Sequence, residues 1–392
     1  MRVLHLTTEF PPLIYGGLGT AVGGLVAASA ADGLGVAVLL VGGGSIGYEP
    51  ASDDAAAGPG PTRVRAGGVT RFEASHSDAL QVGLEIVRRW RPDVIHLHTF
   101  WLWPLARDLR SRTGVPLVYT VHSLDRAEYD VGHGPPECMA QWDVQSDLIA
   151  SSDRVIALTR SERELIGEYC PAARGRVRVV GNGITDTAGA RAAAGRKRIG
   201  LHPIVLFTGR FVERKGIGDL LDAIPIVLRD VDDARFVLAG GHRGSTGDEM
   251  ARYWAPGHVD RIQFTGWLSA EEMSAWYRAA DVLVVPSWYE PFGMVVLEGM
   301  LHGLAIAAAK VGGPAEILEE GRTGLLFPAR DPIALASSLV RLLTNPELRR
   351  ELGSAAAAEV RETWAYARVV RSVRSVYEEA LTSPAARPAA PR

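Results

Sequence analysis

The sequence contains little cysteine and no long apolar run, and these absences exclude several classes of protein. Only 2 of the 392 residues are cysteines, Cys138 and Cys170. They are too few for a disulfide framework and lack the spacing of a metal-ligand pair. No stretch approaches the roughly 18 consecutive apolar residues that a membrane-spanning helix needs. A strand pattern begins at Arg2, with no apolar core of a secretion signal before it. We therefore expect a cytoplasmic protein, for which peripheral contact with a membrane stays open.

The chain also lacks an excess of either charge. Its 42 lysines and arginines and 45 aspartates and glutamates give a net charge of −3. The densest basic cluster, at 88–91, is typical of a solvated helix end. Proteins that bind nucleic acid carry a broad basic surface, so we do not expect nucleic acid as a partner. With 47% hydrophobic and 22% charged residues, the composition is that of a globular protein, and the length suggests about two or three domains.

The sequence is built from short β-branched runs that alternate with helical patterns. In the first half, the runs that read as buried strands are 2–7, 36–41, 93–98, 116–121, 154–158 and 177–180. In the second half they are 204–208, 235–239, 262–265, 281–285 and 305–308. Strands that alternate with helices in this way predict an α/β fold with two doubly wound parallel sheets.

A break in the pattern divides the chain. Residues 186–202 are rich in Ala, Gly and Arg and have no apolar period, so we interpret them as a linker between domains 1–185 and 203–365. We expect residues 366–383 to form a helix that packs across both domains. Residues 384–392, rich in Pro and Ala, read as a flexible tail.

Two carboxylates surround the strongest candidate site. Glu290 follows the strand 281–285 in the turn before a helix, and Glu298 lies in the second turn of that helix. Between them, the N–H groups of Gly293, Met294 and Val295 fall at the helix start, where they have no partner within the helix and favour an anion. This arrangement suits a ligand with hydroxyls at both ends and phosphate between them. A surface loop with incidental acids is the alternative.

Three further loops lie at the carboxyl ends of predicted strands, where open α/β sheets bind ligands. Arg210 and Lys215 follow the strand 204–208 and suit a diphosphate. The guanidinium group of Arg210 can donate two parallel hydrogen bonds to it, and the ammonium group of Lys215 supplies a compact positive charge. Gly16 and Gly17 precede a helix and allow the backbone to approach an anion, unless they serve only close helix packing. His122 ends the strand 116–121. Taken alone, each loop could be structural, and a single histidine more often is.

The combined motifs resemble the retaining GT-B glycosyltransferases. The shared features are the Gly-Gly loop, the strand-end His122, the Arg210 and Lys215 loop, and the Glu-x7-Glu motif of Glu290 and Glu298. That family includes sucrose-phosphate synthases, mycothiol-type glycosyltransferases, bacterial mannosyltransferases and, more distantly, glycogen synthases. The resemblance extends over 1–381. The chain has Ile14-Tyr15 where glycogen synthases carry a lysine just before the glycines, which argues against glycogen synthesis.

The resemblance implies two Rossmann-like domains that face a cleft, with the acceptor on the first and the donor mostly on the second. A hexosyl group would move, with retention, from a UDP-, GDP- or ADP-linked sugar to a hydroxyl of a small molecule or glycan. Neither a cofactor nor a metal is implied, and no Asp-x-Asp stands at a strand end. The oligomeric state stays open.

The same resemblance gives roles to individual residues. Those with a catalytic role would be His122, Glu290, Arg210 and Lys215. Those that bind the donor would be Gly16, Gly17, Arg210, Lys215, Gly266, Trp267, Glu290, Phe292, Gly293, Met294, Val295 and Glu298. Aromatic residues that could stack on the acceptor are Phe100, Trp101, Trp103 and Tyr129.

Two other functions stay open for the same fold. A nucleotide-sugar epimerase needs additional acid–base carboxylates, and a non-catalytic binding protein would lose His122 or the cations while it keeps Glu298. Incubation with donor alone separates the first of these from a transferase. An NAD-dependent oxidoreductase is disfavoured because no acidic residue ends the second strand at Val41.

Overall fold

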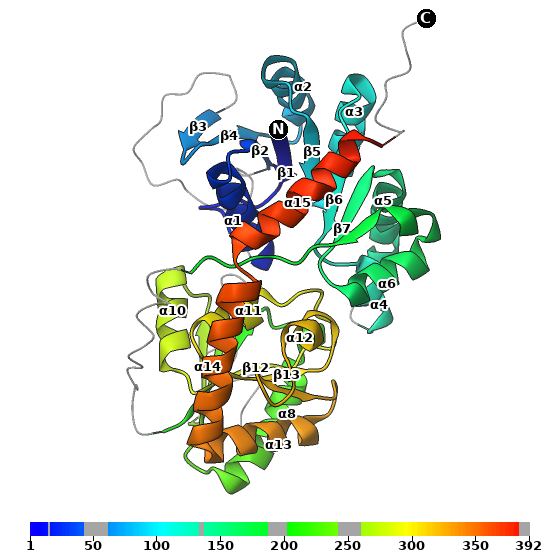
Figure 1. Ribbon diagram of the computed structural model, residues 1–392. Coiled ribbons are helices and arrows are strands. Elements are labelled where there is room, and N and C mark those ends of the chain that lie inside the picture. The colour runs from blue at the N-terminus through cyan, green and yellow to red at the C-terminus, as the bar shows by residue number, and fades with distance from the viewer. Residues whose placement is uncertain (15, 43–61, 133–136, 187–201, 242–259, 384–392) are drawn as a thin grey trace, which may run out of the picture. The chain divides into compact units, whose positions relative to one another are not determined.

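The computed structural model describes residues 1–14, 16–42, 62–132, 137–186, 202–241 and 260–383. It contains two α/β units, shown in Figure 1. Unit 1 comprises Met1–Arg126, Pro136–Gly183 and Tyr366–Arg392, and unit 2 comprises Ala127–Pro135 and Ile184–Ala365.

The described part of unit 1 is built on an eight-stranded sheet of order β3-β4-β2-β1-β5-β6-β7-β8. The strands are β1 (Arg2–Thr7), β2 (Gly35–Val41), β3 (Thr62–Ala66), β4 (Val69–Ala74), β5 (Val94–Leu97), β6 (Leu117–Val121), β7 (Arg154–Ala157) and β8 (Val177–Val179). All neighbours are parallel except the hairpin of β3 and β4. The chain adds strands on one side of β1 and then starts again with β5 on the other side, so the sheet has a topological switch point between β1 and β5.

The main helices of unit 1 are α1 (Gly17–Ala31), α2 (Ala79–Trp90), α3 (Trp103–Thr113), α5 (Glu137–Ser151), α6 (Arg160–Tyr169) and α15 (Tyr366–Leu381). The short α4 (Asp125–Asp130) crosses the division between the units. The C-terminal helix α15 shares one apolar cluster with α1, through Val370, Val373 and Tyr377 against Val22 and Val26.

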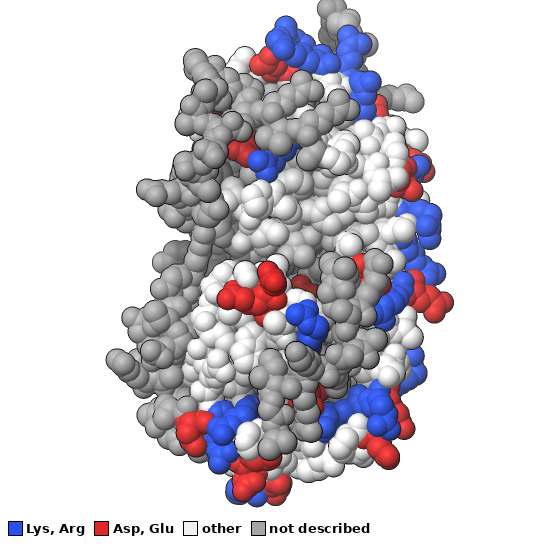
Figure 2. Space-filling view, turned by 90° about the vertical axis from the view of Figure 1, so that its left-hand side faces the viewer, with Lys and Arg blue, Asp and Glu red and all other residues white. Residues whose placement is uncertain are grey.

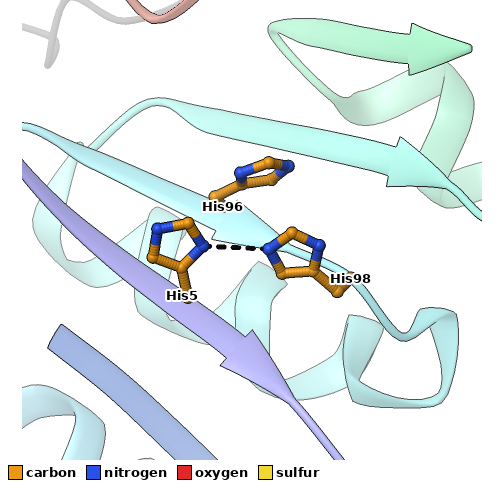
Figure 3. A group of neighbouring side chains, drawn as sticks. All are labelled: His5, His96 and His98. Carbon is orange, nitrogen blue, oxygen red and sulfur yellow. Dashed lines mark hydrogen bonds between the residues drawn. The ribbon is translucent and has the colours of Figure 1, made fainter. Parts of the chain in front are cut away.

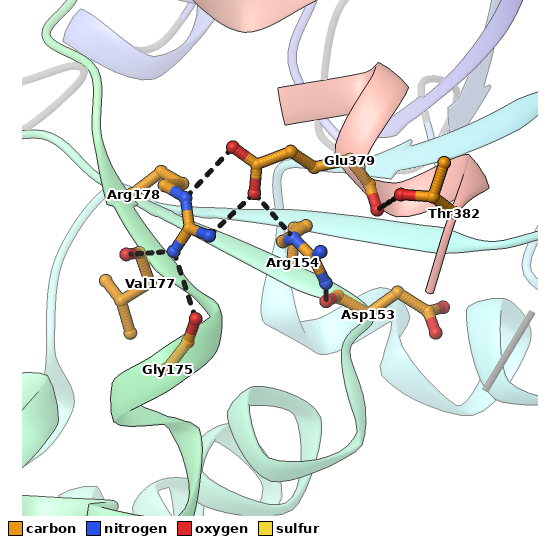
Figure 4. A network of polar contacts seen from close by, with 7 residues as sticks. All are labelled: Asp153, Arg154, Gly175, Val177, Arg178, Glu379 and Thr382. Atoms are coloured by element: carbon orange, nitrogen blue, oxygen red, sulfur yellow. Dashed lines mark hydrogen bonds and ion pairs between the residues drawn. The ribbon is translucent and has the colours of Figure 1, made fainter. Parts of the chain in front are cut away.

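Glu379 fixes the other end of α15 to the sheet. Its carboxylate accepts hydrogen bonds from Arg154 Nε on β7 at 3.0 Å and from Arg178 Nε on β8 at 3.1 Å, as Figure 4 shows. The helix that we expected to pack across both domains is therefore a part of unit 1.

Unit 2 contains a parallel six-stranded sheet among its described residues, of order β11-β10-β9-β12-β13-β14. The strands are β9 (Ile204–Gly209), β10 (Arg235–Gly240), β11 (Ile262–Gly266), β12 (Val282–Val285), β13 (Ala305–Ala309) and β14 (Leu325–Phe327). The helices are α8 (Ile217–Asp230), α10 (Ala270–Ala279), α11 (Met294–Leu301), α12 (Gly312–Ile317), α13 (Pro332–Thr344) and α14 (Pro346–Thr363). The switch point lies between β9 and β12, where ligands bind in doubly wound sheets.

Apolar burial explains why these runs form parallel strands. The residues of β12 and β13 are all buried, as expected when helices cover both faces of a sheet. On one face, Val205, Val282 and Ala307 pack in a single cluster with Leu220 of α8 and Leu339 of α13. The predicted α/β class with two doubly wound sheets is confirmed.

The hairpin of β3 and β4 was not predicted from the sequence. All residues of β4 are half-buried and several are polar, so the apolar alternation that marks a strand is weak. The predicted linker lies outside the described residues except for its two ends, 186 and 202, and the predicted tail at 384–392 lies wholly outside them.

The described surface carries charges of both signs. On the face in Figure 2, acidic and basic side chains lie in small mixed groups between uncharged areas. None of the described helices combines the length and the apolar content needed to cross a membrane.

Candidate active site

The turn after β12 presents Glu290 at the switch point of unit 2. The strand ends at Val285, and Gly293, with φ of 93°, caps the start of α11 without a side-chain hydrogen bond. Glu290, Phe292 and Met294 are buried. The first backbone N–H groups of α11, those of Met294 and Val295, have no acceptor within the helix and are a positive element beside Glu290.

The ammonium group of Lys215 pairs with Glu290. Lys215 Nζ lies 2.5 Å from Glu290 Oε2, and the two side chains are only 17% and 8% exposed. Ser287 Oγ donates a second hydrogen bond to the same oxygen at 3.2 Å. The two residues come from the loops that follow β9 and β12, which are neighbours in the sheet. The sequence-predicted Glu290 and Lys215 therefore lie in contact.

Burial and charge act on this pair in opposite directions. Burial alone would raise the pKa of Glu290, but Lys215, Arg214 and the hydrogen bonds hold that pKa below its usual range. Burial lowers the pKa of Lys215, as do the positive charges of Arg214 and, to a lesser extent, Arg210, while Glu290 opposes the shift. Arg210 itself is exposed, directly after β9. The site thus holds a carboxylate and three neighbouring cations, Lys215, Arg214 and Arg210.

Two glycines allow the loops around Glu290 to approach one another. Gly216 has φ of 67°, and a Cβ there would overlap the carbonyl oxygen of Pro286. A Cβ on Gly313 would overlap the carbonyl oxygen of Phe292, and Gly313 N donates to Glu290 O at 2.9 Å. The loop that carries Lys215 and the start of α12 are therefore both fixed against the turn of Glu290.

Glu298 lies in the second turn of α11 and has a different partner from Glu290. Tyr277 of α10 donates a hydrogen bond from its hydroxyl to Glu298 Oε2 at 2.6 Å. Burial raises the pKa of Glu298, and the bond from Tyr277 opposes that shift. Among the described residues, Oε1 of Glu298 has no hydrogen-bond donor. This oxygen is an acceptor that a ligand hydroxyl could use.

Gly266 and Trp267 lie at the end of β11, on the same edge but two strands from β9. Trp267 is 43% exposed. The structure thus brings Glu290 and Lys215 into contact, with Arg210 near them, whereas Gly266 and Trp267 stand further along the edge.

Unit 1 carries a second group of candidate residues. His122 follows β6 and is part-buried, with Nε2 3.3 Å from His98 Nδ1. His98 follows β5, and His5 on β1 lies 2.9 Å from it through Nδ1. Gly16 and Gly17 begin α1 and are exposed.

Several residues of these sites escaped the sequence analysis. Tyr277 donates a hydrogen bond to Glu298, and Ser287 donates one to Glu290. His98 is hydrogen-bonded to His122, and His5 is hydrogen-bonded to His98. The spacing of His96 and His98 was a usable signal, because residues two apart on a strand share a face. No pattern in the sequence marked Tyr277.

Comparison with known proteins settles the family. A model described as "Glycosyl transferases group 1" matches residues 202–345, and one described as "Glycosyl transferase 4-like domain" matches residues 16–183. The D-inositol 3-phosphate glycosyltransferase of Acidothermus cellulolyticus is 35% identical over 311 residues, 74% of this chain and 67% of the relative. The chain belongs to the group 1 glycosyltransferases.

Other relatives of this glycosyltransferase cover more of its length. The glycogen synthase of Mycobacterium tuberculosis is 29% identical over 397 residues, 96% of this chain and 94% of the relative. Sucrose-phosphate synthase from Thermosynechococcus elongatus has a similar fold, with a TM-score of 0.77 at 23% identity over 96% of this chain and 98% of that chain. The catalytic domain of starch synthase IV from Arabidopsis thaliana gives a TM-score of 0.71 at 16% identity, over 97% and 99% of the two chains.

These matches confirm the family and the GT-B fold that the motifs predicted. The protein is therefore a glycosyltransferase.

Proposed function

We propose that this glycosyltransferase moves a hexosyl group from a nucleotide-diphosphate hexose to an acceptor hydroxyl, and that it does so without a metal ion. The observation that carries the proposal is the buried contact between Lys215 and Glu290 beside the start of α11. The hexose hydroxyls of the donor would then bind Glu290, and its diphosphate would bind the cations. The ribose hydroxyls would bind Glu298.

The leaving diphosphate needs positive charge as the glycosidic bond breaks. Lys215 supplies an ammonium group in a largely water-excluded position, where a fixed charge acts more strongly than in water. Arg210 and the free N–H groups at the start of α11 supply further positive ends. In this proposal these groups replace the divalent ion that other transferases use.

The two carboxylates would bind different parts of the donor. Glu290 is buried and ionised beside Lys215, so it suits hexose hydroxyls close to the reacting carbon. Glu298 has an oxygen without a donor among the described residues and suits the ribose hydroxyls. Trp267, exposed at the end of β11, suits the base.

In unit 1, we propose that the backbone at Gly16 binds the donor. A Cβ there would meet none of the described residues within 4 Å, and its φ of 171° is open to any residue. By contrast, a Cβ on Gly23 would lie 2.7 Å from Pro11. Packing explains Gly23 but not Gly16, and close approach of a ligand to the backbone remains as a reason for glycine. His122 would contact the transferred sugar.

The acceptor would be a polyhydroxylated small molecule or a glycan. Solved structures with the same fold include an Anabaena protein in complex with UDP-glucose and a starch synthase bound to ADP, and several relatives are named for transfer to inositol 3-phosphate. Trp101 is 54% exposed, and its ring centroid lies 4.4 Å from that of Phe100. The two rings together form a surface on which a sugar ring could stack. Trp103 is buried and donates to Asp147, so its role is structural.

A thermal-shift screen of UDP-, GDP- and ADP-glucose, each with excess EDTA or with magnesium, tests the proposal. We expect one nucleotide sugar to raise the melting temperature equally in both conditions, because a ligand that binds only the folded state stabilises it. Release of nucleotide diphosphate should also survive EDTA. Loss of both effects on chelation, with recovery on addition of magnesium or manganese, would overturn the metal-free proposal.

A further inference from the structure

Unit 1 contains a cluster of buried histidines at its switch point, shown in Figure 3. His5 and His96 are paired in register on β1 and β5, and His98 lies two residues beyond His96 on the same face. His5 and His96 are fully buried, and His98 is 3% exposed. Polar rings buried inside a sheet need hydrogen-bond partners. Several of the partners here are other histidines.

Three of the rings form a continuous chain of hydrogen bonds. His5 Nδ1 lies 2.9 Å from His98 Nε2, and His98 Nδ1 lies 3.3 Å from His122 Nε2. We call His5, His98 and His122 the histidine chain. His96 stands beside it, with its two nitrogens on Tyr377 Oη and Thr120 Oγ1, both at 2.7 Å.

Burial keeps the histidine chain neutral. It lowers the pKa of His5 to about 3 and that of His122 to about 4, and it lowers the pKa of His98 well below the usual value. A neutral imidazole has one N–H and one bare nitrogen. Each hydrogen bond in the chain therefore needs an N–H from one ring and a bare nitrogen from the next, and only two arrangements satisfy both bonds.

In the first arrangement His5 donates to His98, and His98 donates to His122. In the second arrangement both bonds run the other way, and His5 then carries its proton on Nε2. That nitrogen is buried and has no partner among the described residues. A small cavity of about 20 Å³ adjoins His98 and His122 and has room for a water molecule, but His5 does not line it.

The end of the chain at His5 decides between the two arrangements. Buried N–H groups without an acceptor are rarer in proteins than unused lone pairs, so the first arrangement is favoured. It leaves His122 with Nε2 occupied by His98 and with its proton on Nδ1. We infer that His98, oriented by His5, is a positioning residue that fixes His122 as a hydrogen-bond donor at Nδ1.

This inference rests on the proposed contact of His122 with the transferred sugar. A fixed N–H suits a sugar oxygen that gains negative charge, whereas a bare nitrogen would suit a hydroxyl proton. The same histidines could in principle hold a metal ion, because their ligand atoms lie within 4.8 Å of one another. However, both nitrogens of His96 and of His98 already take part in hydrogen bonds.

The test is nitrogen NMR of the full chain labelled with ¹⁵N-histidine at pH 7, where the two ring shifts distinguish the neutral tautomers. The difference from His122→Gln identifies the signal of His122. We expect protonation at Nδ1 in the wild type and in His98→Asn, whose amide can still donate, and loss of this preference in His98→Phe. Tyr377→Phe, which removes a partner of His96 only, is the matched control and should leave the signal unchanged.

Release of nucleotide diphosphate is measured on the same variants, with whichever of UDP-, GDP- and ADP-glucose the wild type turns over. Loss of one well-placed donor predicts a fall in kcat of about tenfold in His98→Phe, with recovery in His98→Asn. Protonation of His122 at Nε2 in the wild type, an unchanged tautomer in a folded His98→Phe, or one stoichiometric zinc ion on metal analysis of the protein would overturn the inference. If the wild type turns over none of UDP-, GDP- and ADP-glucose, the proposed function is wrong, while the NMR result still decides the tautomer.

Discussion

Lys215 Nζ lies 2.5 Å from Glu290 Oε2, although the two residues are 75 positions apart in the chain. The contact joins the loops after two neighbouring strands, β9 and β12, at the switch point of unit 2. Because each partner offsets the cost of burying the other, neither can be removed without consequences for charge at the site.

The two carboxylates of the Glu-x7-Glu motif should fail in different ways. Glu290→Gln removes a charge that we propose lies close to the reacting carbon, so we expect kcat to fall about a hundredfold with a smaller change in the KM for the donor. Glu298→Gln weakens a proposed contact with the ribose that would be made equally in the ground and transition states. We expect the donor KM to rise about tenfold with kcat nearly unchanged.

Steady-state kinetics with varied donor measure this difference. Glu271→Gln, which alters an exposed carboxylate on α10, is the control and should change neither constant. The reverse pattern, with Glu298 governing kcat and Glu290 only KM, would show that the assumed orientation of the donor is wrong.

Gly216 should be intolerant of any side chain. Its φ of 67° and its contact with the carbonyl of Pro286 mean that Gly216→Ala must displace the loop of Lys215. We expect a loss of about 1–3 kcal/mol in the free energy of unfolding. Denaturant unfolding measures the loss. Gly218→Ala is the matched control, since a Cβ there meets no atom of the described part of the chain within 4 Å; an equal effect of both substitutions would contradict this expectation.

The histidine chain should make the protein sensitive to mild acid. The pKa of His5 falls to about 3 and that of His122 to about 4, both from burial. Between the usual histidine pKa of about 6.5 and these values, the unfolded chain binds protons that the folded chain does not. Each such histidine therefore adds stability above pH 6.5, and that stability declines by about 1.4 kcal/mol per pH unit as the pH falls through the window.

Urea unfolding at pH 7, 6 and 5 measures this decline. In His5→Leu, the free energy of unfolding should fall less steeply with falling pH, by about 1.4 kcal/mol per pH unit, because that substitution removes one titrating group. A free energy of unfolding that stays constant from pH 7 to pH 5 would contradict the pKa shifts. Glu290, whose pKa Lys215 holds low, acts only at lower pH.

Much of the fold and part of the site could be predicted from the sequence. Glu290 and Lys215 follow apolar runs of strand length, and parallel strands bring their carboxyl ends to one edge. That they touch depends on β9 and β12 being neighbours, which periodicity does not reveal. The partner of Glu298, Tyr277, comes from α10 through tertiary packing alone.

The histidine chain illustrates the same limit. The strand-end position of His122 was visible, and His96 and His98 stand two apart. Their relation to His5 depends on the register of β1 against β5, in which His5 faces His96 across 91 positions of sequence. The hairpin of β3 and β4 was missed because the half-buried, partly polar residues of β4 give no strong apolar alternation.

The most direct test of the account is the turnover number of Lys215→Met for nucleotide diphosphate release, measured at saturating donor and in EDTA. The substitution keeps the length of the side chain and removes the charge that we propose stabilises the leaving diphosphate. We predict a fall of about a hundredfold or more relative to the wild type, with a folded protein by circular dichroism, while Arg229→Ala on the exposed face of α8 stays unchanged. A turnover number within about threefold of the wild type would contradict the central claim, since the loss of a positioned charge in a dry site costs far more.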